Sequence, residues 1–243
     1  MHPTIILVHG AFAESSSWNG VIDALLRAGR QVVAFANPLR GVAADAAGLS
    51  DLVRTIDGPV VLVGHSYAGA VISAVGADVG EVQALVYVAA FAPERGESCL
   101  ELSLRWPGST LGATLQPIPR ADGAVDLTIA RDRFHAQFAA DVSTVEAALM
   151  AATQRPVAQA ALEEAAGDDP LWRTIPSYFV HGDLDLSIPP AALRAMAERA
   201  GARRAIELTG ASHALAVSRP AEAAEVILQA AIRPGSPPAQ SPW

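Results

Sequence analysis

Six short, mainly apolar runs alternate with helical repeats along this chain, and this alternation constrains the fold more than any other feature. Strands covered on both faces have unbroken apolar runs rather than alternating polar and apolar residues. The runs span Thr4 to Val8, Gln31 to Ala36, Pro59 to Val63, Ala84 to Ala89, Ser177 to Val180 and Arg204 to Leu208. Alternating strands and helices imply parallel strands joined by right-handed crossovers. We therefore predict an α/β fold, with a doubly wound, mostly parallel sheet of about six strands and helices on both faces.

The alternation stops between residues 92 and 170, where proline, glycine and two or three helical patches occur without a convincing strand. Ligands of such sheets bind at the carboxyl ends of the strands, so a long insertion at that end is typical of a lid. We predict an α/β core over residues 1–91 and 171–233, a mainly helical lid over 92–170 and a flexible tail over 234–243. The alternative is that the insertion has only a structural role and does not act as a lid over a binding site.

Charge and composition narrow the function classes. The formal net charge is -8, all 17 basic residues are arginine, and no basic cluster is present. This argues against a nucleic-acid or anionic-membrane partner. The single cysteine, Cys99, cannot form an intrachain disulfide, and the first residues lack the features of a signal peptide. We expect a cytoplasmic monomer or homodimer that acts on a small molecule.

The third apolar run leads directly into Gly64-His65-Ser66-Tyr67-Ala68-Gly69 and then into a helical repeat. A sharp strand-to-helix turn with small neighbours exposes a serine Oγ above the sheet, which is the setting of a nucleophile elbow. Ala68 occupies the fifth position of the usual G-x-S-x-G pattern, and glycine follows at Gly69. Ser66 is therefore the candidate nucleophile. We expect Ala68 to change the local geometry of the turn rather than the role of the serine.

A serine hydroxyl needs a base to take its proton, and the base needs a carboxylate to orient it. His213 is the candidate base, because it follows the last apolar run and precedes the last helical repeat. Asp183 and Asp185 both follow the fifth run. We favour Asp185 for its spacing from Gly182, and expect the other acid to be a capping or solvated group. The resulting order of serine, aspartate and histidine is that of α/β-hydrolases.

Developing negative charge on the attacked carbonyl oxygen requires hydrogen-bond donors that already point at it. The backbone N–H of Tyr67 and the N–H of Ala11, in the loop after the first run, are the candidate oxyanion donors. Gly10 allows the backbone to approach closely at this loop. We expect His9 and His65 to have structural roles.

Aromatic residues near these loops are the candidates for binding a substrate. An apolar pocket predicts a small, uncharged, partly hydrophobic ester. Each of these residues could equally pack in the core or the lid. The candidates are Phe12, Tyr67, Phe91, Trp106, Phe134, Phe138 and Trp172.

The motifs HGAF, GHSYAG, YVAAFAP, the run from Gly182 to Pro189 and GASHAL resemble the α/β-hydrolase superfamily over residues 3–232. Within it they resemble small bacterial esterases, which are similar to the plant methylesterase and hydroxynitrile lyase branch. The resemblance implies the roles given above and no metal or organic cofactor. Related lyases have lysine after the catalytic histidine, where this chain has Ala214, and related dehalogenases and epoxide hydrolases have aspartate in place of Ser66. All three activities are therefore disfavoured.

The resulting hypothesis is a serine hydrolase that cleaves a carboxylic ester through an acyl-enzyme on Ser66. A cofactor-independent oxygenase, a perhydrolase or an acyltransferase with the same triad is an alternative. A non-catalytic ligand-binding protein on a hydrolase scaffold is another.

Overall fold

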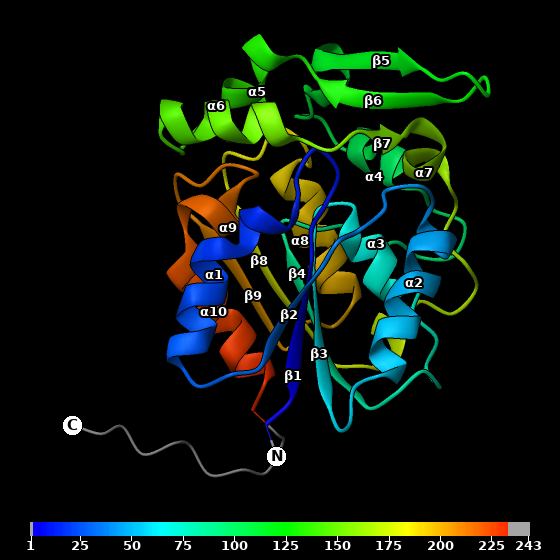
Figure 1. Ribbon diagram of the computed structural model, residues 1–243, viewed down its shortest axis with the longest axis vertical. Coiled ribbons are helices and arrows are strands. Elements are labelled where there is room, and N and C mark those ends of the chain that lie inside the picture. Colours follow the sequence, from blue (N-terminus) through cyan, green and yellow to red (C-terminus); the bar gives the residue numbers. More distant parts are fainter. Residues whose placement is uncertain (1, 233–243) are drawn as a thin grey trace.

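The computed structural model describes residues 2–232 and is built around a six-stranded parallel sheet with the strand order β2-β1-β3-β4-β8-β9 (Figure 1). All neighbouring strands in it run parallel. This confirms the predicted fold class, while the predicted flexible tail, 234–243, lies outside the described residues. The strands are β1 (Thr4–Val8), β2 (Val32–Phe35), β3 (Val60–His65), β4 (Val82–Val88), β8 (Ser177–Gly182) and β9 (Arg204–Leu208).

Helices cover both faces of the sheet, which explains why its central strands are largely apolar. In β1, Ile5 and Leu7 pack into one core cluster, and Ile6 and Val8 pack into another on the opposite face. One face is covered by α1 (Asn19–Arg27), α9 (Leu215–Ser218) and α10 (Pro220–Ala230). The other is covered by α2 (Val42–Arg54), α3 (Ala68–Ser73) and α8 (Pro190–Arg199). Figure 1 shows these layers on either side of the strands.

The insertion lies over the carboxyl ends of the strands (Figure 1). Its helices are α4 (Cys99–Arg105), α5 (Arg131–Phe138), α6 (Thr144–Thr153) and α7 (Gln159–Glu163). The expectation that it lacks strands was wrong, because a three-stranded antiparallel sheet joins β5 (Leu115–Pro119), β6 (Val125–Ile129) and β7 (Val157–Ala158). Two prolines obscure the first of these strands in the sequence, and an edge strand tolerates them. A short 3-10 helix, Leu111–Thr114, also belongs to the insertion, while two others, Ser15–Trp18 and Leu171–Arg173, lie outside it.

Among residues 2–232, no helix combines the length and the apolar character needed to cross a membrane. The predicted cytoplasmic location and oligomeric state stay predictions. So does the predicted division into a core and a lid.

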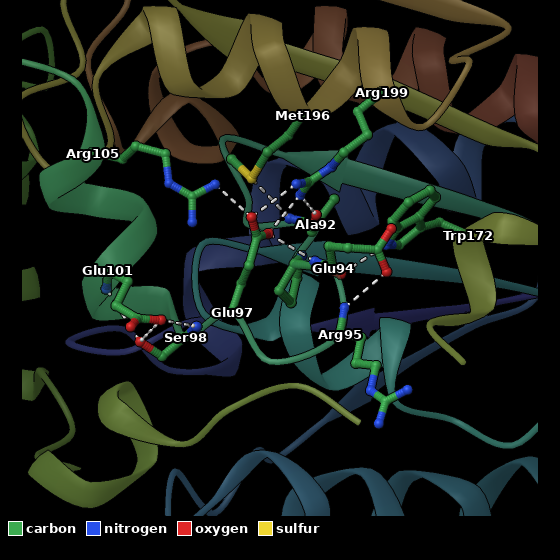
Figure 2. Close-up of polar contacts among 11 residues, drawn as sticks. Ala92, Glu94, Arg95, Glu97, Ser98, Glu101, Arg105, Trp172, Met196 and Arg199 are labelled. Atoms are coloured by element: carbon green, nitrogen blue, oxygen red, sulfur yellow. Dashed lines mark hydrogen bonds and ion pairs between the residues drawn. The ribbon is translucent and has the colours of Figure 1, made fainter. Parts of the chain in front are cut away.

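The start of the insertion is tied to the core by a cluster of charged side chains centred on Glu97 (Figure 2). Glu97 accepts hydrogen bonds from Arg199 of α8 at 2.8 and 3.0 Å and from Arg105 of α4 at 2.5 Å. The backbone N–H of Glu94 donates to the same carboxylate at 2.8 Å. Burial alone would raise the pKa of Glu97, but these donors outweigh it and lower the pKa to about 2. Glu97 therefore holds α4 and α8 together as an ionised group.

We expect Glu97→Gln to lower the free energy of unfolding by about 1–3 kcal/mol at pH 7, because two arginines lose their shared carboxylate. The pKa of Glu97 is depressed by folding, so its stabilisation is complete above the ordinary pKa of 4.5 and is lost as the pH falls towards 2. Urea unfolding between pH 7 and pH 3 should show the two proteins converging at low pH. Asp23→Asn is the control, because the Asp23 side chain is 62% exposed beside Arg27. Equal unfolding curves for the two variants at every pH would contradict the role of Glu97.

Candidate active site

The candidate site lies where the chain changes direction across the sheet. From β1 the chain passes to β2 on one side and then to β3 on the other. The loops that follow β1 and β3 therefore diverge and leave a crevice at the carboxyl edge, which is where ligands of open α/β sheets bind. A Cβ on Gly10 would lie 2.6 Å from the carbonyl oxygen of His65 and 2.7 Å from Cβ of Ser66. Glycine at this position thus allows the two loops to pack directly against each other.

Ser66 lies at the tip of the turn between β3 and α3. Its φ angle is 55°, in the left-handed region that residues with a Cβ rarely adopt. Its backbone N–H donates to the carbonyl of Val88 at 3.3 Å, and its carbonyl accepts from the N–H of Phe91 at 3.2 Å. A Cβ on Gly69 would lie 2.1 Å from the carbonyl oxygen of Phe91. The close approach between this turn and the segment after β4 therefore requires glycine at position 69.

His213 and Asp185 form a buried pair. His213 Nδ1 lies 2.6 Å from Asp185 Oδ2, and the two side chains are 1% and 0% exposed. The other carboxylate oxygen, Oδ1, accepts the N–H groups of Ser187 at 2.8 Å and Ile188 at 2.9 Å. A carboxylate that faces Nδ1 favours the tautomer with the proton on that nitrogen. His213 Nε2 is then left with a lone pair that can accept a proton.

The neighbouring acid has a different partner. Asp183 Oδ1 accepts the backbone N–H of Gly210 at 2.7 Å, at the start of the loop that carries His213. Both acids therefore contribute to the arrangement of this loop. Asp185 contacts the imidazole and Asp183 holds the backbone of the turn.

The Ser66 side chain and His213 line one cavity, together with Ala11 and Tyr67. His213 Nε2 is buried and has no hydrogen-bond partner among the described residues, so no bond joins it to Ser66 Oγ in this conformation. Catalytic hydrogen bonds are often long or misaligned in the absence of substrate. Within residues 2–232, the backbone N–H groups of Ala11 and Tyr67 donate no hydrogen bond either. These groups remain available to a bound molecule.

The two other histidines of this region are held in place by backbone groups. His9 Nδ1 lies 3.0 Å from the carbonyl of Gly10, and His9 Nε2 accepts the N–H of Asn37 at 3.0 Å. His65 Nε2 lies 3.0 Å from the carbonyl of His213. Burial lowers the pKa of His9 to about 4 and that of His65 to about 3, so both are neutral at pH 7.

Three of the aromatic candidates line the cavity with Tyr67, namely Phe12, Phe91 and Phe138. Trp106, Phe134 and Trp172 are not among its lining residues. Phe134 is fully buried and packs against Phe138 with ring centroids 5.1 Å apart. Trp172 Nε1 donates to the carbonyl of Pro93 at 2.9 Å, in the cluster of Figure 2, and Trp106 packs at the edge of the core. Aromatic character alone did not indicate which side chains face the crevice.

Most of the remaining lining was missed by sequence reasoning. It is aliphatic or small, and much of it comes from α4 and the segment that follows it. Within this group Cys99 is buried, and burial raises the pKa of its thiol. A capping box at Ser98 and Glu101 begins α4 and was the available sequence signal. The missed lining residues are Cys99, Leu100, Ser103, Leu104, Ser109, Leu111, Gly112, Leu115, Leu162, Ser187 and Ile188.

Comparison with known proteins identifies the family. Residues 5–226 match the alpha/beta hydrolase family. The chain belongs to this family. This α/β-hydrolase is 33% identical over 110 residues to the carbendazim hydrolyzing esterase of Nocardioides sp. (strain SG-4G). The matched residues make up 40% of this chain and 46% of that protein. The match thus spans about half the length of that relative.

Solved structures share the hydrolase fold along nearly the whole chain. Polyneuridine aldehyde esterase superposes with a TM-score of 0.80 at 18% identity, covering 94% of this chain and 99% of that one. The Arabidopsis methylesterase MES16 superposes with a TM-score of 0.77 at 16% identity, covering 94% and 98%. These confirm the predicted resemblance to the methylesterase branch at the level of the fold.

In this α/β-hydrolase the insertion also supports the loop that carries His213. The N–H of Ala214 donates to the carbonyl of Phe138 at 2.9 Å, and Ser212 Oγ donates to Asp141 at 2.5 Å. The Phe138 ring lies 4.9 Å from the His213 ring, nearly perpendicular to it. The region around the end of α5 is therefore a wall of the site as well as part of its cover.

Proposed function

We propose that this α/β-hydrolase is a serine esterase that cleaves small, partly hydrophobic carboxylic esters. The observation that carries the proposal is the 2.6 Å contact between His213 Nδ1 and Asp185 Oδ2, in a cavity that His213 shares with Ser66. A histidine oriented in this way can activate a serine hydroxyl. The esterase names of the relatives are consistent with this chemistry.

The reaction follows from these groups. Ser66 Oγ attacks the ester carbonyl carbon while its proton passes to His213 Nε2, and the N–H groups of Ala11 and Tyr67 stabilise the oxyanion. His213 then donates the proton to the departing alkoxide, which leaves an acyl-enzyme on Ser66. Water repeats the sequence: its proton goes to His213, its oxygen bonds to the acyl carbon, and Ser66 recovers its proton as the acid leaves. Asp185 stabilises the imidazolium that forms in each half-reaction.

The cavity favours a small, uncharged substrate. Its volume is about 70 Å³, and none of the arginine, aspartate or glutamate residues between 2 and 232 lines it. Pockets that enclose drug-sized ligands usually measure roughly 300–1,000 Å³. In this conformation the site therefore suits a short acyl group, and larger esters would require the insertion to move.

The proposal is tested by labelling with a fluorophosphonate and by a panel of p-nitrophenyl esters of increasing acyl length. We expect covalent modification at Ser66, found by mass spectrometry of peptides, and the highest kcat/KM for the shortest esters. A protein that neither labels nor hydrolyses any of these esters would be better described as a non-catalytic binding protein.

A further inference from the structure

Ser187 has a buried hydroxyl that the triad does not use. It lies two residues after Asp185, lines the cavity and is 2% exposed. Its backbone is fully engaged: its N–H donates to Asp185 Oδ1 at 2.8 Å, and its carbonyl accepts from Ser109 Oγ at 3.0 Å. Its Oγ is buried without a hydrogen-bond partner among the described residues. A buried hydroxyl left unpaired in this way is costly to the folded state.

Apart from Ser66, the candidate nucleophile, the other lining hydroxyls of the described chain have partners. Tyr67 Oη donates to Asp45 Oδ2 at 2.9 Å. Ser103 Oγ donates to the carbonyl of Leu100 at 2.7 Å, and Ser109 Oγ donates to Ser187. Among the described residues that line the cavity, two buried polar side-chain atoms lack a hydrogen-bond partner: His213 Nε2 and Ser187 Oγ. The proposed mechanism uses the first. Ser187 Oγ has no partner among the surrounding side chains, which are mostly aliphatic or aromatic. Its partner would therefore be a polar atom of the molecule that fills the cavity.

The position of Ser187 is well determined by its neighbours. The carbonyl of the preceding residue, Leu186, accepts the N–H of Thr110 at 3.0 Å and Nε2 of Gln137 at 2.8 Å. With the bond from Ser109, three hydrogen bonds from the insertion therefore hold this short segment. A hydroxyl on such a rigid support is suited to discriminate between substrates, since little ordering is needed when it binds.

We propose that Ser187 Oγ hydrogen bonds to an uncharged oxygen substituent of the substrate, a hydroxyl or a carbonyl, a few bonds from the ester group that is cleaved. This deepens the proposed esterase function and rests on it, by naming oxygen-substituted short esters as the substrate class. A serine hydroxyl can both donate and accept, so it serves either substituent. A carboxylate substituent fits less well, because no arginine of the described part of the chain lines the cavity.

The test compares matched ester pairs. On the acid side the pair is p-nitrophenyl butyrate and p-nitrophenyl 3-hydroxybutyrate, and on the alcohol side it is ethyl butyrate and 2-hydroxyethyl butyrate, followed by pH-stat. The wild type should prefer the hydroxylated member of at least one pair, and the pair concerned identifies the side of the ester that faces Ser187. Ser187→Ala should reduce this kcat/KM ratio about tenfold, and Ser187→Thr should retain most of it.

Ser103→Ala is the matched control, because it removes a hydroxyl of the same cavity that already has a partner. It should leave the ratios close to those of the wild type. The role of Ser187 would be overturned if Ser187→Ala left the kcat/KM ratios of both ester pairs unchanged. If the wild type were still labelled by fluorophosphonate, the proposed esterase function would stay intact. Failure of the wild type to label would overturn both.

Discussion

Ser66→Ala should lower kcat/KM for p-nitrophenyl esters by about 10⁴–10⁶-fold, because it removes the hydroxyl that forms the acyl-enzyme in the proposed mechanism. The fold should be retained. Alanine requires no more room than serine, and the hydrogen bonds that hold this position come from the backbone of Val88 and Phe91. The measurement is steady-state hydrolysis, with label incorporation as a second readout.

Urea unfolding provides the control for this variant. The free energy of unfolding should change by less than about 1 kcal/mol, which separates loss of chemistry from loss of structure. Ester hydrolysis that persists at the wild-type rate in Ser66→Ala would contradict the acyl-enzyme mechanism. It would favour a reaction in which the serine is not the nucleophile, such as that of a cofactor-independent oxygenase.

Asp185→Asn should lower kcat/KM by about 10³–10⁴-fold. Oδ1 of Asp185 accepts two backbone N–H groups, so the carbonyl oxygen of the asparagine would take that place. Its NH₂ group would then face Nδ1 of His213 and stabilise the tautomer with the proton on Nε2. A histidine in that tautomer cannot accept the proton of Ser66. Label incorporation should slow together with hydrolysis, since both depend on the activated serine.

Asp183→Asn is the matched control for this prediction. Its side-chain carbonyl can still accept the N–H of Gly210, and it does not contact His213. We expect less than about a threefold change in kcat/KM. Equal losses in the two variants would show that the whole loop, rather than the Asp185 carboxylate, governs the rate.

The sequence alone was sufficient for the parts of the fold that depend on local pattern. The apolar runs predicted the six core strands, because a strand buried on both faces contains few solvated residues. The edge strand β9 fits this pattern least, since it includes Arg204 and the exposed Glu207. The insertion was less accessible. β5 includes Pro117 and Pro119, and β7 has two residues, Val157–Ala158. β5 pairs with β6 directly after it, whereas β7 pairs with the same strand from further along the chain, beyond α6. Prolines in β5 and the shortness of β7 hide both strands from an analysis of periodicity.

At the site, the sequence was sufficient to propose the candidate serine and histidine. A nucleophile elbow, and the order of serine, aspartate and histidine along the chain, leave few other candidates for these roles. The tertiary structure decided which of two acids contacts His213, and which aromatic side chains face the cavity rather than the core. It also revealed the unpaired hydroxyl of Ser187. These features depend on the direction of each side chain and on partners far away in the chain, and local sequence does not encode either of them.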